Sequence, residues 1–91
     1  MDLIFSKRAL EQMIRRNINY EIVLSTVSMP NQTIVDDKDP AIVVCQSLIK
    51  ERESGQVFLL RVFVNRDKQP NVVVTLCKTT QISKYYENKI Q

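Results

Sequence analysis

The sequence has no histidine and only two cysteines, Cys45 and Cys77, among its 91 residues. Zinc sites are built mainly from cysteine and histidine, so two distant cysteines make a poor ligand set. Both cysteines fall in apolar, strand-like segments, where a free cysteine behaves as a small buried hydrophobic residue. A reducing cytoplasm disfavours a disulfide between them. We therefore expect neither a metal site nor a cofactor.

Long apolar segments are also missing. No stretch approaches the roughly 20 apolar residues of a membrane-spanning helix, so we expect no membrane partner. The N-terminal region contains Asp2 and lacks the apolar centre of a secretory signal, which predicts a cytoplasmic protein. Thirteen basic and ten acidic residues give a net charge of +3, which permits binding to nucleic acid or an acidic partner without requiring it.

The length of 91 residues predicts one domain over residues 1–91. A chain this short buries a modest share of its surface, so a homodimer is a reasonable expectation. Its first thirty residues predict two helices joined by a tight turn. Ser6 is a suitable N-cap for a helix over residues 7–16, and Asn17 tolerates the left-handed conformation that ends a helix. Asn19 can cap a second helix, which Pro30 ends.

After Pro30 the pattern changes from helix to strand. We expect four strands, over residues 33–36, 41–50, 57–64 and 72–77. Short polar loops join them, which makes neighbouring strands antiparallel. The predicted fold is α+β, with two N-terminal helices packed on a mainly antiparallel four-stranded sheet, followed by a short C-terminal helix. The predicted core contains Leu10, Met13, Ile22, Leu60, Val62, Val64, Val74 and Leu76.

The strand over residues 57–64 is the most apolar, so we expect it at the centre of the sheet. Arg61 is its one charged residue. Strand alternation places Arg61 on the face opposite Leu60 and Val62. Two interpretations stay open. Arg61 could be an ordinary arginine whose stem lies along its neighbours on a solvated face, or a cation held in a groove on the sheet.

A set of short motifs spans nearly the whole chain: Phe5, Lys7, Ala9, Met13, Arg15-Arg16, Ile18, Pro30, Leu60-Arg61-Val62, Val73-Val74-Thr75 and Lys84-Tyr85. In this order they resemble an uncharacterised prokaryotic domain family with the pattern K-H-A-x-x-R-M, V-V-T-V-Y and K-Y. That family is similar to the RelE, ParE and BrnT toxins of type II toxin–antitoxin systems. The resemblance implies a helical hairpin on an antiparallel sheet. It also implies a small metal-independent ribonuclease or ribosome-dependent mRNA interferase, neutralised by an acidic antitoxin.

The chain departs from the family pattern at four positions. The family histidine is Arg8, the arginine before the methionine is Gln12, and the glycine before Ile18 is Asn17. The tyrosine that usually follows V-V-T-V is Cys77. Two of the polar positions best suited to chemistry in the family are therefore changed here.

Cleavage of RNA through its 2′-hydroxyl needs a base, cations for the developing charge and an acid for the leaving oxygen. Following the resemblance, Arg16 and Arg61 would stabilise the phosphorane, because a guanidinium group matches phosphate geometry. Lys84 would act as base or acid, and Tyr85 would donate a proton or stack on a base. We predict that these four residues converge on one groove.

Four further basic residues are expected to bind RNA phosphates: Lys7, Arg8, Arg15 and Lys78. The alternative for most of these charges is an ordinary solvated helix surface. Three functions remain open from the sequence: a toxin-type ribonuclease, a non-catalytic module that binds RNA or the ribosome, and a protein-interaction domain that pairs through an exposed strand edge.

Overall fold

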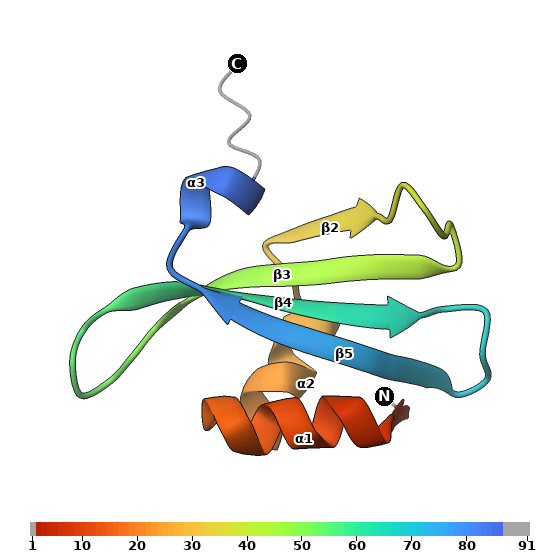
Figure 1. Cartoon of the computed structure of the whole chain (residues 1–91), viewed down its shortest axis with the longest axis horizontal. Coiled ribbons are helices and arrows are strands. Elements are labelled where there is room, and N and C mark those ends of the chain that lie inside the picture. The colour runs from red at the N-terminus through yellow and green to blue at the C-terminus, as the bar shows by residue number, and fades with distance from the viewer. Residues whose placement is uncertain (1, 87–91) are drawn as a thin grey trace.

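The computed structural model describes residues 2–86 and has an α+β architecture built on a five-stranded mixed sheet. The elements in chain order are β1 (Leu3–Phe5), α1 (Lys7–Arg16), α2 (Tyr20–Ser28), β2 (Gln32–Val35), β3 (Ile42–Lys50), β4 (Val57–Asn65), β5 (Asn71–Thr79) and α3 (Ile82–Tyr85). The strand order is β1-β5-β4-β3-β2, so β4 is central, as its apolarity predicted. Helices α1 and α2 cover one face of the sheet, and the short α3 lies on the other side (Figure 1).

The helical hairpin forms through local signals that the sequence carries. The Ser6 hydroxyl accepts a hydrogen bond from the Ala9 amide at 3.0 Å and donates one to the Val74 carbonyl at 2.6 Å. Asn17 ends α1 in the left-handed conformation, with a φ of 54°. The Asn19 side chain then accepts a hydrogen bond from the Ile22 amide at 2.9 Å and caps α2. These three capping residues confirm the predicted boundaries of the hairpin.

The prediction of a four-stranded sheet was wrong by one strand. Residues Leu3–Phe5 form β1, which pairs in parallel with Asn71–Val73 of β5 and makes the sheet mixed. A three-residue segment is too short to show strand alternation, and its partner lies at the far end of the chain. The other four strands pair with one another in antiparallel fashion and lie within about two residues of the predicted ranges.

The core lies between the sheet and the helical hairpin. Its buried apolar residues are Ala9, Ile18, Val23, Val43, Cys45, Phe58, Leu60, Val62, Val64, Val73 and Leu76. Of the predicted core residues, Leu60, Val62, Val64 and Leu76 are buried, whereas Met13, Ile22 and Val74 are half-buried. Leu10 was predicted wrongly, because 48% of it is exposed. Ala9 is the residue of α1 that faces the sheet fully, so Leu10, one position further round the helix, turns toward solvent.

Candidate functional site

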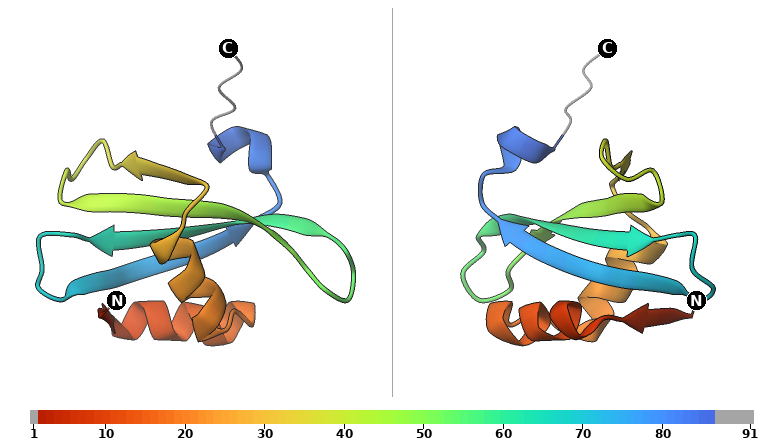
Figure 2. Two further views of the ribbon diagram at one scale, coloured as in Figure 1. Left: turned by 180° about the vertical axis from the view of Figure 1, so that it is seen from behind. Right: turned by 45° about the vertical axis from the view of Figure 1, so that its right-hand side comes forward.

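A row of polar side chains crosses the sheet on the face opposite α1 and α2. Strand register pairs Gln32 with Gln46, Gln46 with Arg61, and Arg61 with Cys77. The row therefore runs over β2, β3, β4 and β5 in turn. Leu60 and Val62, the sequence neighbours of Arg61 on β4, lie on the core side of the sheet and are fully buried. The sheet thus separates this polar row from the apolar core. Both views in Figure 2 show α3 on the side of the sheet opposite α1 and α2.

Arg61 is held in a fixed position within this row. Its Nε donates a hydrogen bond to Gln46 Oε1 at 2.9 Å. Its guanidinium carbon lies 4.4 Å from the centroid of the Tyr85 ring and 5.4 Å from that of Phe63. No carboxylate within residues 2–86 forms a salt bridge with Arg61, so its positive charge is uncompensated there. Arg61 is therefore held on this face of the sheet by Gln46 and Tyr85 and is half-buried there.

Gln46 is the residue that organises the row, and nothing in the sequence pattern had singled it out. It is fully buried, with an exposed fraction of 0%. Its Nε2 donates to Gln32 Oε1 at 2.8 Å and to the Tyr85 carbonyl at 3.1 Å. One amide therefore ties β2, β4 and α3 to β3. The available signal was an amide in the middle of the apolar β3 segment, since a buried polar side chain needs bonded partners.

Lys84 and Tyr85 reach the Arg61 surface from α3. The Lys84 Nζ lies 5.3 Å from the Tyr85 ring centroid, so Arg61 and Lys84 both contact the same aromatic ring. Lys84 is exposed to solvent, and Tyr85 is half-buried. The structure thus brings together three of the four residues that were predicted to converge. We call Arg61, Lys84 and Tyr85 the Arg61 cluster.

Arg16, the fourth predicted residue, belongs to the end of α1 and is exposed. No hydrogen bond, salt bridge or ring contact within the described chain joins it to the Arg61 cluster. Both arginines nevertheless act on Cys77. Burial raises the pKa of the Cys77 thiol, and the charges of Arg61 and Arg16, together with a hydrogen bond from Arg61, oppose that shift. Arg16 therefore influences the polar row through its electric field.

The four residues predicted to bind RNA lie on the side of the sheet opposite the Arg61 cluster. Lys7, Arg8 and Arg15 are exposed on α1, on the far side of the sheet from Arg61. Lys78 also belongs to that far side: its Nζ lies 4.4 Å from the Phe58 ring centroid and 3.8 Å from Glu51 Oε2. The charge of Lys78 is therefore engaged in packing and in an ion pair, and its contacts do not connect it to the Arg61 cluster.

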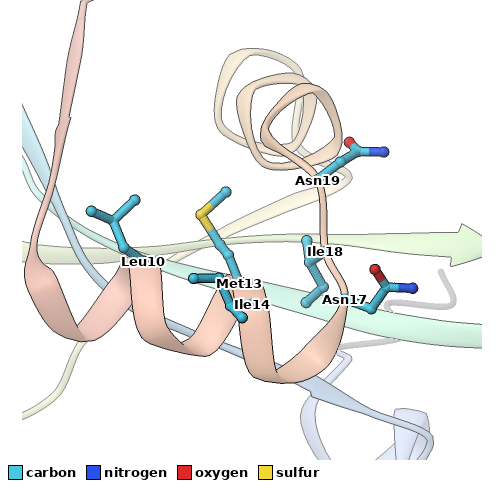
Figure 3. Close-up of a pocket in the computed structure, with 6 residues that line it drawn as sticks. All are labelled: Leu10, Met13, Ile14, Asn17, Ile18 and Asn19. Atoms are coloured by element: carbon cyan, nitrogen blue, oxygen red, sulfur yellow. The ribbon is translucent and has the colours of Figure 1, made fainter.

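A second surface feature lies beside the helical hairpin. Leu10, Met13 and Ile14 of α1 line an open groove that continues over Ile18, with Asn17 and Asn19 at its end (Figure 3). The exposed fraction of Ile14 is 82%. Leu10 and Met13 were predicted to belong to the core. Helical periodicity shows that residues share a side of a helix, but it does not show what covers that side.

Other site types have little support in the described residues. No group of three or more histidine, cysteine, aspartate or glutamate side chains within residues 2–86 could hold a metal ion. None of the helices in this part of the chain is long and apolar enough to cross a membrane.

Comparisons of the chain with protein-family models, with curated proteins and with solved structures found no match. The resemblance to the toxin families therefore stays a prediction, and the chemistry of the Arg61 cluster carries the functional argument.

Proposed function

We propose that this protein is a toxin-like protein of a type II toxin–antitoxin system that inhibits translation by cleaving RNA on the sheet face occupied by the Arg61 cluster. The observation that carries the proposal is the guanidinium group of Arg61, which is fixed by Gln46, lies over the Tyr85 ring and has no salt bridge within residues 2–86. The architecture of a helical hairpin on one face of a largely antiparallel sheet supports it, because the resemblance to RelE-like toxins implied such a hairpin.

The proposed mechanism uses cations and one aromatic ring. Arg61 donates from Nε to Gln46 and also makes a hydrogen bond to the Cys77 thiol, and its remaining N–H groups would meet a phosphate group. Lys84 adds a second positive charge at the same ring and would take part in proton transfer. Tyr85 would stack on a base or donate to the leaving oxygen. Arg16 would add its field from the end of α1. Partners would be RNA or the ribosome, an acidic antitoxin and a second copy of the chain.

A non-catalytic RNA-binding module is the second candidate. The absence of histidine from the whole sequence favours it, because histidine is the side chain best suited to proton transfer near neutral pH. The two candidates share the Arg61 surface but differ in the fate of the bound RNA. Cleavage leaves shorter RNA, whereas binding alone leaves the RNA intact.

Induced expression in a bacterial host tests the proposal. We expect growth arrest and shortened mRNA with the wild-type chain, and relief of both with Arg61→Ala. The control is Arg52→Ala, which removes an equal charge from an exposed loop residue and should leave the arrest unchanged. Circular dichroism and urea unfolding of each purified variant establish that it is folded.

The outcomes separate the candidates clearly. Growth arrest with intact RNA and Arg61-dependent RNA binding supports the non-catalytic module. Normal growth together with soluble wild-type protein and no RNA binding rejects both. Equal relief by Arg52→Ala and Arg61→Ala would show that net charge matters and the Arg61 cluster does not.

A further inference from the structure

Helix α1 carries a second apolar stripe on its solvent side. Leu10 and Ile14 lie one helical turn apart and so share a side of the helix. Their exposed fractions are 48% and 82%. The opposite side of α1 already supplies the buried Ala9 to the core. The Leu10–Ile14 stripe is therefore surplus to what folding the helical hairpin requires.

The Leu10–Ile14 stripe forms one wall of a surface groove. Met13 extends from α1 into the space beside α2, and Ile18 lies in the turn between the helices (Figure 3). The groove lined by these residues has a volume of about 530 Å³. An apolar groove of this kind along a helix suits the apolar side of another helix. We call Leu10, Met13, Ile14 and Ile18 the α1 groove.

The charge around the groove limits what can occupy it. Helix α1 contains Lys7, Arg8, Arg15 and Arg16 against the single acidic residue Glu11, an excess of three positive charges. The net charge of the whole chain is also +3, so α1 accounts for all of its excess. Two copies of this chain meeting through α1 would repel each other. An RNA backbone would satisfy the arginines but would leave Leu10 and Ile14 uncovered.

We infer that the α1 groove binds an acidic amphipathic helix from another protein. Its apolar side chains cover Leu10 and Ile14, and its carboxylates pair with Lys7 and Arg15. These two residues lie about 12 Å apart along the axis of α1, so the complementary carboxylates are spaced about two helical turns apart. This inference rests on the partner that the proposed function invokes, and it places that partner on the side of the sheet opposite Arg61.

A synthetic helical peptide provides the probe. It is about 20 residues long, so that it can hold a helix, and has leucines on one side and glutamates elsewhere. Binding to the purified full chain is followed by fluorescence anisotropy, and the contact surface is mapped by amide chemical shifts. Three peptide controls are a scrambled sequence, a version with lysine in place of glutamate, and a single-stranded RNA.

The protein variants are matched by exposure. Ile14→Ser removes an apolar side chain from the groove, and Met29→Ser removes one outside it; both residues are 82% exposed. Arg15→Gln and Lys38→Gln form the corresponding charge pair of exposed residues. We expect the groove variants Ile14→Ser and Arg15→Gln each to weaken binding of the acidic peptide by about tenfold or more. Met29→Ser, Lys38→Gln and Arg61→Ala should leave it unchanged.

Several results would overturn the inference. One is failure of the acidic peptide to bind, or equal losses for Ile14→Ser and Met29→Ser. Another is RNA binding or self-association that depends on Ile14, which would assign the groove to those ligands. Loss of peptide binding in Arg61→Ala would place the peptide on the sheet face of the Arg61 cluster and not in the α1 groove. Because this variant tests RNA cleavage separately, failure of the groove and failure of the proposed function are distinguishable.

Discussion

Gln46 and Arg61 should be energetically coupled, because a charge-assisted hydrogen bond of 2.9 Å joins a fully buried amide to a half-buried guanidinium group. Arg61→Met keeps the apolar stem and removes the charged group. Gln46→Leu keeps the side-chain volume and removes the amide. A double-mutant cycle built from these two changes isolates the interaction between them.

The magnitudes depend on the partners that each change leaves behind. Arg61→Met removes the hydrogen-bond donor to the buried Gln46 Oε1, which costs about 1–3 kcal/mol. It also loses the contact with the Tyr85 ring, which is 4.4 Å away and is worth about 0.5–1 kcal/mol. We therefore expect a loss of about 1.5–4 kcal/mol in the free energy of unfolding. Gln46→Leu removes the hydrogen-bond partner of Arg61 Nε and of the Tyr85 carbonyl, so its loss in the free energy of unfolding should be at least as large.

The double variant removes both halves of the bond, so its loss should be smaller than the sum by about 1.5–3 kcal/mol. Urea unfolding followed by circular dichroism measures all four proteins, and a constant m-value shows that the unfolded states are comparable. The control cycle uses Glu51→Ala and Ser54→Ala, because the exposed side chains of these two residues share a 2.6 Å hydrogen bond. A Gln46–Arg61 coupling below about 0.5 kcal/mol would refute the reasoning, because exposed pairs typically reach that value.

Three further predictions concern stability and thiol chemistry. Leu60→Ala should lower the free energy of unfolding, measured in urea, by about 2–5 kcal/mol. Leu10→Ala, at a half-exposed site, should lower it by less than about 1 kcal/mol. Equal losses would contradict the observed burial. Asn17→Gly should keep stability in the same melts, and Asn17→Val should lose about 1–2 kcal/mol or more, because φ is 54°. Burial raises the pKa of the Cys45 and Cys77 thiols, so alkylation at pH 8 should be slower in the native chain than in the urea-unfolded chain. The free energy of unfolding should also fall as the pH rises through the ordinary thiol range, because there the unfolded chain releases protons that the folded chain retains. Thiols that react equally in both states would contradict this last expectation.

The parts of the fold that the sequence predicted depend on neighbouring residues. Ser6, Asn17 and Asn19 act on backbone groups within five residues of themselves, so their capping roles were visible without a structure. Alternation along β4 likewise placed Arg61 and Leu60 on opposite faces. Strand β1 was missed because its three residues gain their partners from β5, with Ser6 bonded to Val74 across 68 positions.

The candidate site was predictable only in part, for the same reason. Arg61, Lys84 and Tyr85 were selected through a resemblance and do lie together. Gln46 was missed because its importance depends on register: it stands opposite Arg61 on β4 and opposite Gln32 on β2. Pairings between strands cannot be read from the composition of either strand. The exposure of Leu10 was missed because hydrophobic periodicity does not distinguish a buried stripe from an exposed one.

The alternation along β4 also explains why core and site can be studied separately. Leu60 and Arg61 are adjacent in sequence, yet Leu60 is fully buried under the helical hairpin and Arg61 lies half-buried beside α3. A change at Leu60 disturbs the packing that both surfaces require, whereas a change at Arg61 acts on the polar row and on the Tyr85 and Phe63 rings. Changes at Ile14 affect neither, because its side chain is largely solvated. The sheet therefore divides the molecule into a cationic cluster and an apolar groove that single substitutions can test independently.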